Sequence, residues 1–295
     1  MSAELESKVA SLPVWRGTPQ LAPLTGGVSN VSFLVTDGSG KYVARMGGDH
    51  PVHHVSRERE LIASRAAHAA GFSPEVVYAE PGVMILRFIA AHRYTEGDVR
   101  ANTLRCAELL ARCHADLVRR ITGPPAIFWV FHVLRDYFAG LERISHKMAP
   151  ELPRWRAILA KLEAAQLPLP VIFGHHDLLA TNFLDDGNKI WLIDWEYGAF
   201  GTAMFDLANL ASNNALGRME EHVLLETYFG KPPGEALWRS FDAMKIASGL
   251  REAVWAVMSG LYVKAPGIDY DAYAEEFINR FEAGLAAYEH KYGKL

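Results

Sequence analysis

Residues 171–209 constrain this chain more than any other segment, because they combine an apolar strand, a polar loop and a hairpin in one run. Residues 171–173 are apolar, and Gly174 follows them, so we expect a strand that ends in a loop over residues 175–182. Loops of this kind often carry catalytic side chains. A turn and a second strand then deliver Asp194, and the hairpin brings this residue back beside the loop.

Three oxygen-bearing side chains are expected to converge at this point, namely Asp177, Asn182 and Asp194. Phosphoryl transfer from a nucleoside triphosphate requires such groups, because Mg²⁺ neutralises the phosphates and prefers hard oxygen ligands, usually including one or two carboxylates. Asn182 and Asp194 suit the metal. Asp177 suits a catalytic base that accepts a hydrogen bond from a substrate hydroxyl, aims it at the γ-phosphorus and takes its proton.

The spacing of these residues matches a known phosphoryl-transfer motif. Residues 175–177 read His-His-Asp, and Asn182 follows after four further residues, as in the H-R-D-x-x-x-x-N loop of protein kinases, while Asp194 stands in the place of the D-F-G aspartate. Taken singly, each acid would suit an ordinary surface or turn position, and we keep that interpretation for Asp185 and Asp186. The ordered combination favours a kinase.

The same segment resembles the choline/ethanolamine kinases and their aminoglycoside-phosphotransferase-like relatives, which carry H-N-D-L-L-x-x-N, then I-D-F-E-Y, then F-D-I-x-N. Here His-His-Asp-Leu-Leu, Ile-Asp-Trp-Glu-Tyr and, at residues 205–209, Phe-Asp-Leu-Ala-Asn stand in that order. The resemblance implies an α+β, bilobal protein-kinase-like fold that binds ATP and Mg²⁺. It places a nucleotide-binding lobe at residues 1–87 and a catalytic and substrate-binding lobe at residues 88–295, in which Asp206 braces the catalytic loop.

Composition sets the class of protein and excludes some partners. With 295 residues, 50% of them hydrophobic and 22% charged, the chain is an ordinary globular protein long enough for two lobes. Its formal charge of -4 offers no basic face, so we expect no nucleic-acid partner. We also expect no membrane insertion and a cytoplasmic location, because no segment reads as a secretory signal or a bilayer span. The oligomeric state stays open.

A glycine-rich turn in the first lobe is the predicted phosphate loop. Residues 25–30 separate two expected strands, and glycines let backbone N–H groups approach phosphate oxygens. A turn of this composition is also typical of a plain hairpin. The resemblance to the family's Gly-rich loop assigns Gly27, Ser29 and Asn30 to the nucleotide.

Arg45 is the predicted nucleotide cation. It lies on the strand where protein kinases place a phosphate-pairing lysine, and the choline-kinase-like family commonly has arginine there. Its partner should come from the helix that begins near Ser56. Glu60 is favoured by resemblance to the family's R-x-x-E pattern, and Glu58 is the rival.

Beyond the first sheet the sequence predicts a hinge and then a helical lobe. Residues 86–91 are the expected hinge, whose backbone meets adenine, and Arg87 and Phe88 are assigned to the nucleotide on that basis. Cys106 and Cys113 are expected to be free thiols, because two helical turns exceed the Cα separation that a disulfide allows. Helical periodicity covers residues 99–121, 129–145, 154–165, 206–215, 220–229, 235–262 and 270–292.

The predicted acceptor is a small amino alcohol, with choline or ethanolamine favoured by the resemblance. Its ammonium group would lie against aromatic faces by cation–π attraction, with a carboxylate nearby. In the family, a second tryptophan completes this aromatic cage and an acidic residue follows F-D-I-x-N, but Met258 and Asn213 stand in these two places here. The aromatic cage and its countercharge are therefore weaker than in established choline kinases. The acceptor site is assigned to Asp177, Glu196, Tyr197, Asn213 and Trp255.

Other functions fit the same pattern less well. Thiamine, an aminoglycoside or a sugar are alternative acceptors within the same superfamily. A nucleotide-binding module without activity is a further alternative, because fold and motif alone do not establish turnover. The presence of Asp177, Asn182 and Asp194 together argues for catalysis. Trp255 also fits a plain core position on an apolar helix.

Overall fold

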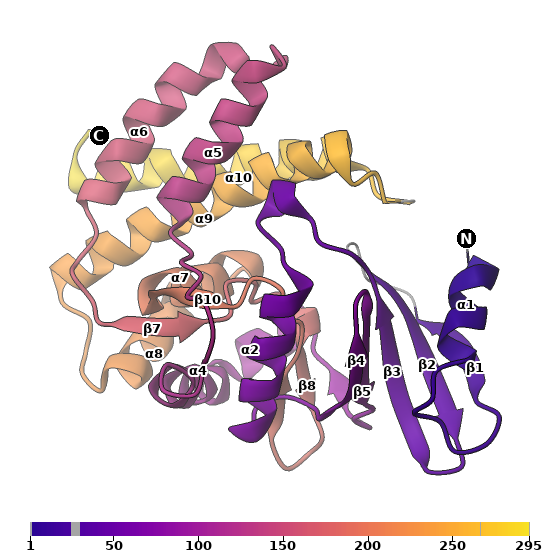
Figure 1. Ribbon diagram of the computed structural model, residues 1–295. Helices are drawn as coiled ribbons and strands as arrows, with labels where there is room; N and C mark the ends of the chain where they lie inside the picture. Colours follow the sequence, from indigo (N-terminus) through magenta and orange to yellow (C-terminus); the bar gives the residue numbers. More distant parts are fainter. Residues whose placement is uncertain (1, 25–29, 266, 295) are drawn as a thin grey trace.

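The structure, a computed structural model, describes residues 2–24, 30–265 and 267–294. Helix accounts for 53% and strand for 17% of it, and the sheet lobe with a larger helical lobe confirms the predicted α+β kinase-like fold (Figure 1). The phosphate-loop residues Gly27 and Ser29 lie outside the described residues. The first lobe comprises α1 (Ser2–Ala10), β1 (Gln20–Leu24), β2 (Val31–Asp37), β3 (Gly40–Met46), α2 (Arg57–Ala69), β4 (Val76–Glu80) and β5 (Val83–Arg87).

The strands of this lobe form one antiparallel sheet of order β1-β2-β3-β5-β4. Alternate residues of β3 are buried, among them Tyr42, Ala44 and Met46, as the two-residue period of a strand requires. They pack in a small separate core that includes Val9 of α1. The alternation turns Arg45 to the opposite face of the sheet, toward the helical lobe.

A short segment between β3 and α2 ties the two lobes together. It contains the 3₁₀ helix η1 (Pro51–His53) and rises to the end of α9 (Figure 1). The imidazole of His53 is buried there, with Nδ1 3.0 Å from the hydroxyl of Tyr137 and Nε2 2.9 Å from the hydroxyl of Ser259. The chain then enters α2, with Ser56 at its N-cap.

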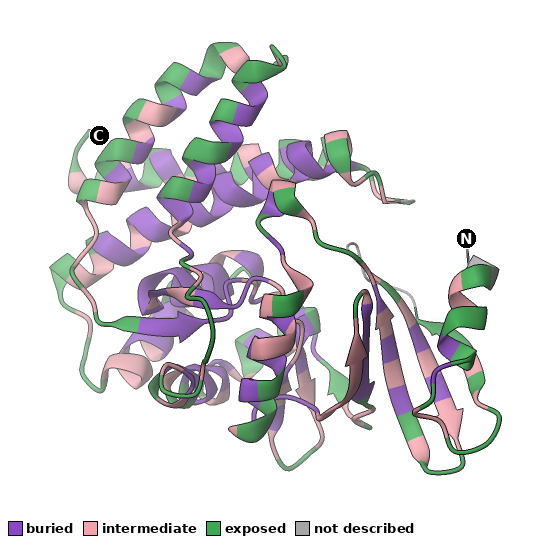
Figure 2. Ribbon diagram, viewed as in Figure 1, coloured by how far each residue is buried: buried purple, intermediate pink, exposed green. Residues whose placement is uncertain are grey.

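The helical lobe is built around α9, which is buried along most of its length and packs against α5, α6, α7 and α10 (Figure 2). A long helix with few polar breaks is expected in the centre of a lobe. The helices are α3 (Glu96–Ala101), α4 (Thr103–Leu117), α5 (Val130–Arg143), α6 (Leu152–Ala164), α7 (Ala203–Asn213), α8 (Arg218–Phe229), α9 (Glu235–Tyr262) and α10 (Tyr270–Tyr292), with the 3₁₀ helices η2 (Ala149–Glu151) and η3 (Ala180–Asn182).

Two small antiparallel sheets of the helical lobe carry the catalytic segment. One pairs β7 with β10, and the other has the order β6-β8-β9. Because β8 and β9 form the predicted hairpin, the chain returns to the loop that follows β7. Their bounds are β6 (His92–Arg93), β7 (Val171–Gly174), β8 (Phe183–Asp185), β9 (Ile190–Leu192) and β10 (Ala199–Thr202).

One predicted helix is wrong in its extent. Residues 99–121 were expected to be continuous, but the structure has α3 and α4 with a break at Asn102, whose φ of -116° and ψ of 25° are not helical. A capping box of Thr95 and Asp98 begins α3 earlier than predicted, because these side chains satisfy the first backbone N–H groups. Both cysteines are free, as predicted, and the structure buries both of them. Within the described residues, no helix has the length and apolarity needed to cross a bilayer.

Candidate active site

The loop after β7 is held in place by Asp206 of α7. The backbone N–H groups of His175 and His176 each donate to a different oxygen of the Asp206 carboxylate, at 2.8 Å in both cases. The Nε2 atom of His114 lies 2.9 Å from Asp206 Oδ2. A side chain on Gly174 would clash here, because an added Cβ would lie 2.7 Å from His176 Nε2 and 2.9 Å from Asp206 Oδ2. The predicted bracing role of Asp206 is confirmed by these hydrogen bonds.

Further contacts fix the loop from both sides. Leu178 donates its backbone N–H to Asn209 Oδ1 at 2.7 Å and accepts at its carbonyl from Asn214 Nδ2 at 2.9 Å. His176 and Asp194 adopt left-handed backbone conformations, with φ of 63° and 70°. Residues other than glycine take such conformations at a cost, and they concentrate at functional sites.

Asp177, Asn182 and Asp194 line one cavity of 110 Å³, which we call the catalytic cavity. Asn182 donates from Nδ2 to the carbonyl oxygen of Asp177 at 2.9 Å and to its carboxylate at 3.3 Å. These bonds turn the amide nitrogen toward Asp177 and leave the amide oxygen as a lone-pair donor. Together with the Asp194 carboxylate, this oxygen forms the type of donor set that Mg²⁺ takes when phosphates supply the other ligands.

Arg45 joins the sheet lobe to Asp194. Its Nη2 atom lies 2.7 Å from Asp194 Oδ1, and its Nη1 atom lies 2.7 Å from Glu60 Oε1. Glu60 rather than Glu58 is therefore the partner on α2. Burial alone would raise the pKa of Asp194, but the charge and hydrogen bond of Arg45 outweigh this effect, with smaller contributions from other cations, and the pKa is lowered. Asp194 is thus held as a carboxylate before any metal binds.

Glu196 belongs to the same ionic network. Arg57 of α2 contacts both Glu60 and Glu196 through Nη1, at 2.5 Å and 2.9 Å. The chain of charges therefore runs from Asp194 through Arg45, Glu60 and Arg57 to Glu196. Glu196 also lines the catalytic cavity, as its assignment to the acceptor requires. The contact with Arg57 of α2 holds its carboxylate in place.

The environment of Asp177 suits a group that takes up a proton. Burial raises the pKa of its carboxyl well above the ordinary value, and the negative charge of Glu252 adds to the rise, while Arg251 opposes it. The optimal pKa of a general base lies near the operating pH. The sequence prediction did not require a raised pKa for Asp177, and the structure supplies one through burial.

A second cavity, of 290 Å³, lies between the lobes, and we call it the nucleotide cavity. Arg45, Arg87 and Phe88 line it, as their assignment to the nucleotide requires. The backbone N–H groups of Arg87 and Phe88 already donate to the carbonyls of Glu75 and Lys41, at 2.9 Å and 3.0 Å. Any hydrogen bond donated by the hinge to adenine would therefore come from residues 89–91.

Asn30, the one residue of the predicted phosphate-loop assignment that the structure describes, lines a neighbouring cavity of 560 Å³. Arg45 and Glu60 also line this cavity. Asn30 therefore lines the same cavity as the Arg45–Glu60 ion pair. Arg45 of this pair also contacts Asp194. Its role toward the phosphates stays a prediction.

The acceptor side of the catalytic cavity contains aromatic and charged residues. Trp255 donates from Nε1 to the Tyr197 hydroxyl at 2.9 Å, and the Tyr273 hydroxyl lies 3.4 Å from Glu252 Oε2. All four residues line the cavity, together with Arg251. The assigned residues Tyr197 and Trp255 are therefore brought together with Asp177.

Two of the expected cage positions lie elsewhere. Asn213 is buried on α7 and does not line the catalytic cavity, although every residue of α7 is described. We therefore leave Asn213 out of the acceptor site. Met258 is buried, and a Cβ added at Gly140 of α5 would lie 3.2 Å from its methyl carbon. The position of the family's second tryptophan is thus a core contact between α5 and α9.

Sequence reasoning missed Arg251, Glu252 and Tyr273. A signal for the first two was present, because an adjacent Arg–Glu pair interrupts an apolar helix near Trp255. Charged residues are almost never fully buried unless they are paired or functional. Tyr273 lies on α10 and carries no comparable signal, because aromatic residues recur along that helix.

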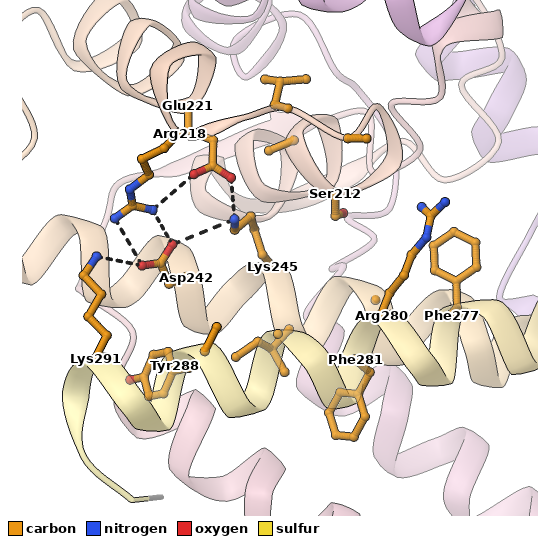
Figure 3. A pocket seen from close by; sticks show the side chains of 17 residues that line it. Ser212, Arg218, Glu221, Asp242, Lys245, Phe277, Arg280, Phe281, Tyr288 and Lys291 are labelled. Atoms are coloured by element: carbon orange, nitrogen blue, oxygen red, sulfur yellow. Dashed lines mark hydrogen bonds and ion pairs between the residues drawn. The ribbon is translucent and has the colours of Figure 1, made fainter.

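A further cavity, of 720 Å³, lies between α7, α8, α9 and α10, and none of these residues lines it. Arg218 and Lys291 contact the carboxylate of Asp242, while Lys245 contacts Glu221 (Figure 3). Because these charges neutralise one another, they do not by themselves indicate a ligand. The candidate active site is the junction of the catalytic and nucleotide cavities.

Buried histidines at the site predict that acid weakens the fold. Burial lowers the pKa of His53 to about 3, with the charge of Arg251 adding to the effect, and burial lowers the pKa of His176 to about 4. Both values lie below the ordinary 6.5. The contribution of these neutral histidines to the free energy of unfolding is therefore fully present above about pH 6.5. It is lost as the pH falls toward these pKa values, by about 1.4 kcal/mol per pH unit for each histidine.

Urea unfolding at a series of pH values measures this loss. Between about pH 6.5 and pH 5, the variant His53→Gln should show a smaller slope of the free energy of unfolding against pH. The reduction should be about 1.4 kcal/mol per pH unit, which is the contribution of one histidine. His290→Gln, at an exposed position of α10, is the matched control and should keep the wild-type slope. An equal slope in wild type and His53→Gln would show that His53 is not held neutral.

Comparison with known proteins gives a consistent set of relatives. Residues 20–244 match the sequence profile of the Phosphotransferase enzyme family. The chain is 26% identical to a probable ethanolamine kinase of Arabidopsis thaliana, over 80% of this chain and 71% of that protein. It is 27% identical to protein LicA of Haemophilus influenzae, over 69% of this chain and 61% of LicA. A solved structure of a choline/ethanolamine kinase family protein from Mesorhizobium loti has a TM-score of 0.78 and 28% identity, and covers 96% of this chain and 94% of its own.

Proposed function

Because the chain belongs to the phosphotransferase enzyme family, we propose that it transfers the γ-phosphate of ATP, in the presence of Mg²⁺, to the hydroxyl group of a small amino alcohol. Choline and ethanolamine are the favoured acceptors. One observation carries this proposal. Asn182 and Asp194 line both the nucleotide cavity and the catalytic cavity, whereas Asp177 lines only the latter.

This arrangement separates the metal from the base. Asn182 and Asp194 would hold Mg²⁺ at the junction of the two cavities, and the metal supplies charge neutralisation to the phosphate oxygens when it is bound. Arg45, already paired with Asp194, adds a fixed positive charge on the nucleotide side. Such preorganised charges stabilise the transition state without reorganisation during the reaction.

Asp177 would act on the acceptor side. Its carboxylate accepts a hydrogen bond from the acceptor hydroxyl and holds the oxygen in line with the γ-phosphorus. A bond forms between this oxygen and phosphorus as the bond from phosphorus to the β,γ-bridging oxygen breaks, and Asp177 takes the hydroxyl proton. ADP is the leaving group. The raised pKa of Asp177, caused chiefly by burial, favours this uptake.

Several features of the cavity support a cationic acceptor. Glu252 is buried beside the aromatic residues Trp255 and Tyr273, and a buried carboxylate with aromatic neighbours attracts an ammonium group. The names of the relatives, which include an ethanolamine kinase, point to the same acceptor class. The complete trio of Asp177, Asn182 and Asp194 argues against a module without activity.

A substrate panel tests the proposal. ADP release should be fastest with an amino alcohol when choline, ethanolamine, thiamine, kanamycin and a hexose are compared by kcat/KM, which reports differential binding of the transition state. EDTA should abolish turnover, and added Mg²⁺ should restore it, because Asn182 and Asp194 need the metal to position the phosphates. Turnover that survives full chelation would contradict the assigned metal role.

A variant of Trp255 reports on the aromatic wall. Trp255→Ala should raise KM for the preferred amine by about twofold to thirtyfold, because cation–π contacts contribute about 0.5–2 kcal/mol. KM for ATP should stay constant, since Trp255 does not line the nucleotide cavity. A hexose that outcompetes every amine would remove the amino-alcohol proposal and leave the phosphotransferase assignment intact.

A further inference from the structure

Arg251 and Glu252 form a buried ion pair in the middle of α9. Arg251 is 1% exposed and Glu252 is 3% exposed, and Arg251 Nη1 lies 2.6 Å from Glu252 Oε1. The flanking residues on α9 are buried and mostly apolar. An ion pair in such a place costs desolvation free energy that its own attraction does not reliably offset. A purely structural role would be met equally well by apolar residues.

The pair is incomplete on the arginine side. Arg251 Nε and Nη2 are buried and have no hydrogen-bond partner among the described residues. These two nitrogens share one edge of the guanidinium group, and that edge can bind both oxygens of a carboxylate side by side. Leaving two such donors unsatisfied is costly in a folded protein. The described polar groups around Arg251 thus supply no acceptor for this edge.

The position of Arg251 connects this residue with the acceptor. Arg251 lines the catalytic cavity and also a smaller cavity of 30 Å³, and both cavities are lined by His53, Glu196 and Tyr197 as well. Its guanidinium carbon lies 4.6 Å from the centroid of the Tyr197 ring. That contact occupies one face of the aromatic ring that sequence comparison assigned to the ammonium group.

The other charged cavity differs in this respect. Between α8, α9 and α10, Arg218, Lys245 and Lys291 contact Asp242 or Glu221 (Figure 3), and Arg280 contacts Glu276. None of their nitrogens is both buried and without a partner among the described residues. Among the described arginine and lysine residues that line the two cavities, only Arg251 has buried nitrogens without a hydrogen-bond partner in the described part of the chain.

We infer that the acceptor is a hydroxylated amino acid, whose ammonium group binds Glu252 and whose carboxylate binds the Nε and Nη2 edge of Arg251. This inference rests on the proposed function, keeps its class of small hydroxylated amines and replaces choline and ethanolamine by an amino acid as the favoured acceptor. Because both nitrogens are buried, the guanidinium has to turn toward the cavity for this edge to meet the carboxylate. The hydroxyl is phosphorylated as derived above, with its proton passing to Asp177, so the inference needs no further reactant.

Matched pairs of acceptors test the inference. L-serine and ethanolamine differ only by the carboxylate, as do L-homoserine and 3-aminopropan-1-ol. In at least one pair the amino acid should have the higher kcat/KM, by about tenfold or more, because hydrogen bonds to a charged group contribute about 1.5–3 kcal/mol. In Arg251→Met this ratio should fall to about one. In Glu252→Gln both members should lose kcat/KM by a similar factor, because both carry the ammonium group.

The outcomes separate the inference from the proposed function. If ethanolamine or choline is phosphorylated and neither amino acid is preferred to its partner, the inference is wrong and the proposed function stands. If no acceptor is phosphorylated, the proposed function fails, and calorimetric titration of L-serine and L-homoserine into protein saturated with a non-hydrolysable ATP analogue decides the binding question. Binding that Arg251→Met abolishes would support the carboxylate site, and absence of binding to wild type would overturn it.

Misfolding of Arg251→Met is controlled in two ways. Thermal unfolding of the variant identifies a destabilised protein, and Arg251→Lys keeps the charge but lacks the two-nitrogen edge. The lysine variant should retain only part of the preference for the amino acid. The comparison of acceptors with wild type needs no variant, so the inference can fail even if both variants are unstable.

Discussion

Replacing Asp177 by asparagine is expected to lower kcat about 10³-fold, within the range that general bases contribute, while KM for ATP changes by less than about threefold. Asparagine can still accept a hydrogen bond from the acceptor hydroxyl, but it cannot take the proton. KM for ATP is preserved because Asp177 does not line the nucleotide cavity, whereas Asn182 and Asp194 do. Steady-state assays of ADP release with the preferred acceptor measure both constants.

A second acid of the same segment provides the control. Asp186 accepts hydrogen bonds from the backbone N–H groups of Asn188 and Lys189 through Oδ1, which asparagine can also accept, and one from Trp191 Nε1 through Oδ2, which the amide nitrogen of asparagine cannot. Asp186 lines neither the catalytic cavity nor the nucleotide cavity. Asp186→Asn should therefore keep kcat within about twofold of wild type, as turn substitutions of this kind are mild. If Asp177→Asn retains more than about a tenth of the wild-type kcat, Asp177 is not the general base.

The catalytic segment could be predicted because its information is local. The spacing of Asp177, Asn182 and Asp194 fixes a loop and a hairpin within a few residues of sequence, and hairpin geometry brings their ends together. Its bracing by Asp206 followed from resemblance to the family. The long helices α9 and α10 were also predictable, since sustained periodicity is the strongest signal for a helix.

The acceptor site could not be predicted to the same extent, because it is formed by packing between distant elements. Glu252 on α9 and Tyr273 on α10 meet only after two long helices pack together. His53 comes from the sheet lobe and reaches the same cavity through η1. Family resemblance directed attention to Asn213 and Met258, whereas helix packing buries both of them away from the cavity or in the core.

Replacing Asp206 by asparagine is expected to lower the free energy of unfolding by about 3 kcal/mol, because removal of a buried charge that several donors share leaves those donors unsatisfied. Asp206 is 0% exposed, and its carboxylate receives the N–H groups of His175 and His176 and contacts His114. The amide nitrogen of asparagine would face at least one of these donors. The catalytic loop should loosen, so kcat should fall with stability.

The pH dependence distinguishes loss of this carboxylate from a packing defect. Burial alone would raise the pKa of Asp206, but the charge of His176 and the hydrogen bond of His114, with the backbone bonds, lower it below its ordinary 3.8. Its contribution is therefore present above that value and is lost as the pH falls below it. Urea unfolding should show that Asp206→Asn lacks this acid-dependent loss, whereas Asp269→Asn, at the exposed N-cap of α10, should stay within about 0.5 kcal/mol of wild type. A stability difference between wild type and Asp206→Asn that is the same at about pH 6 and about pH 3 would indicate that the Asp206 charge does not hold the loop.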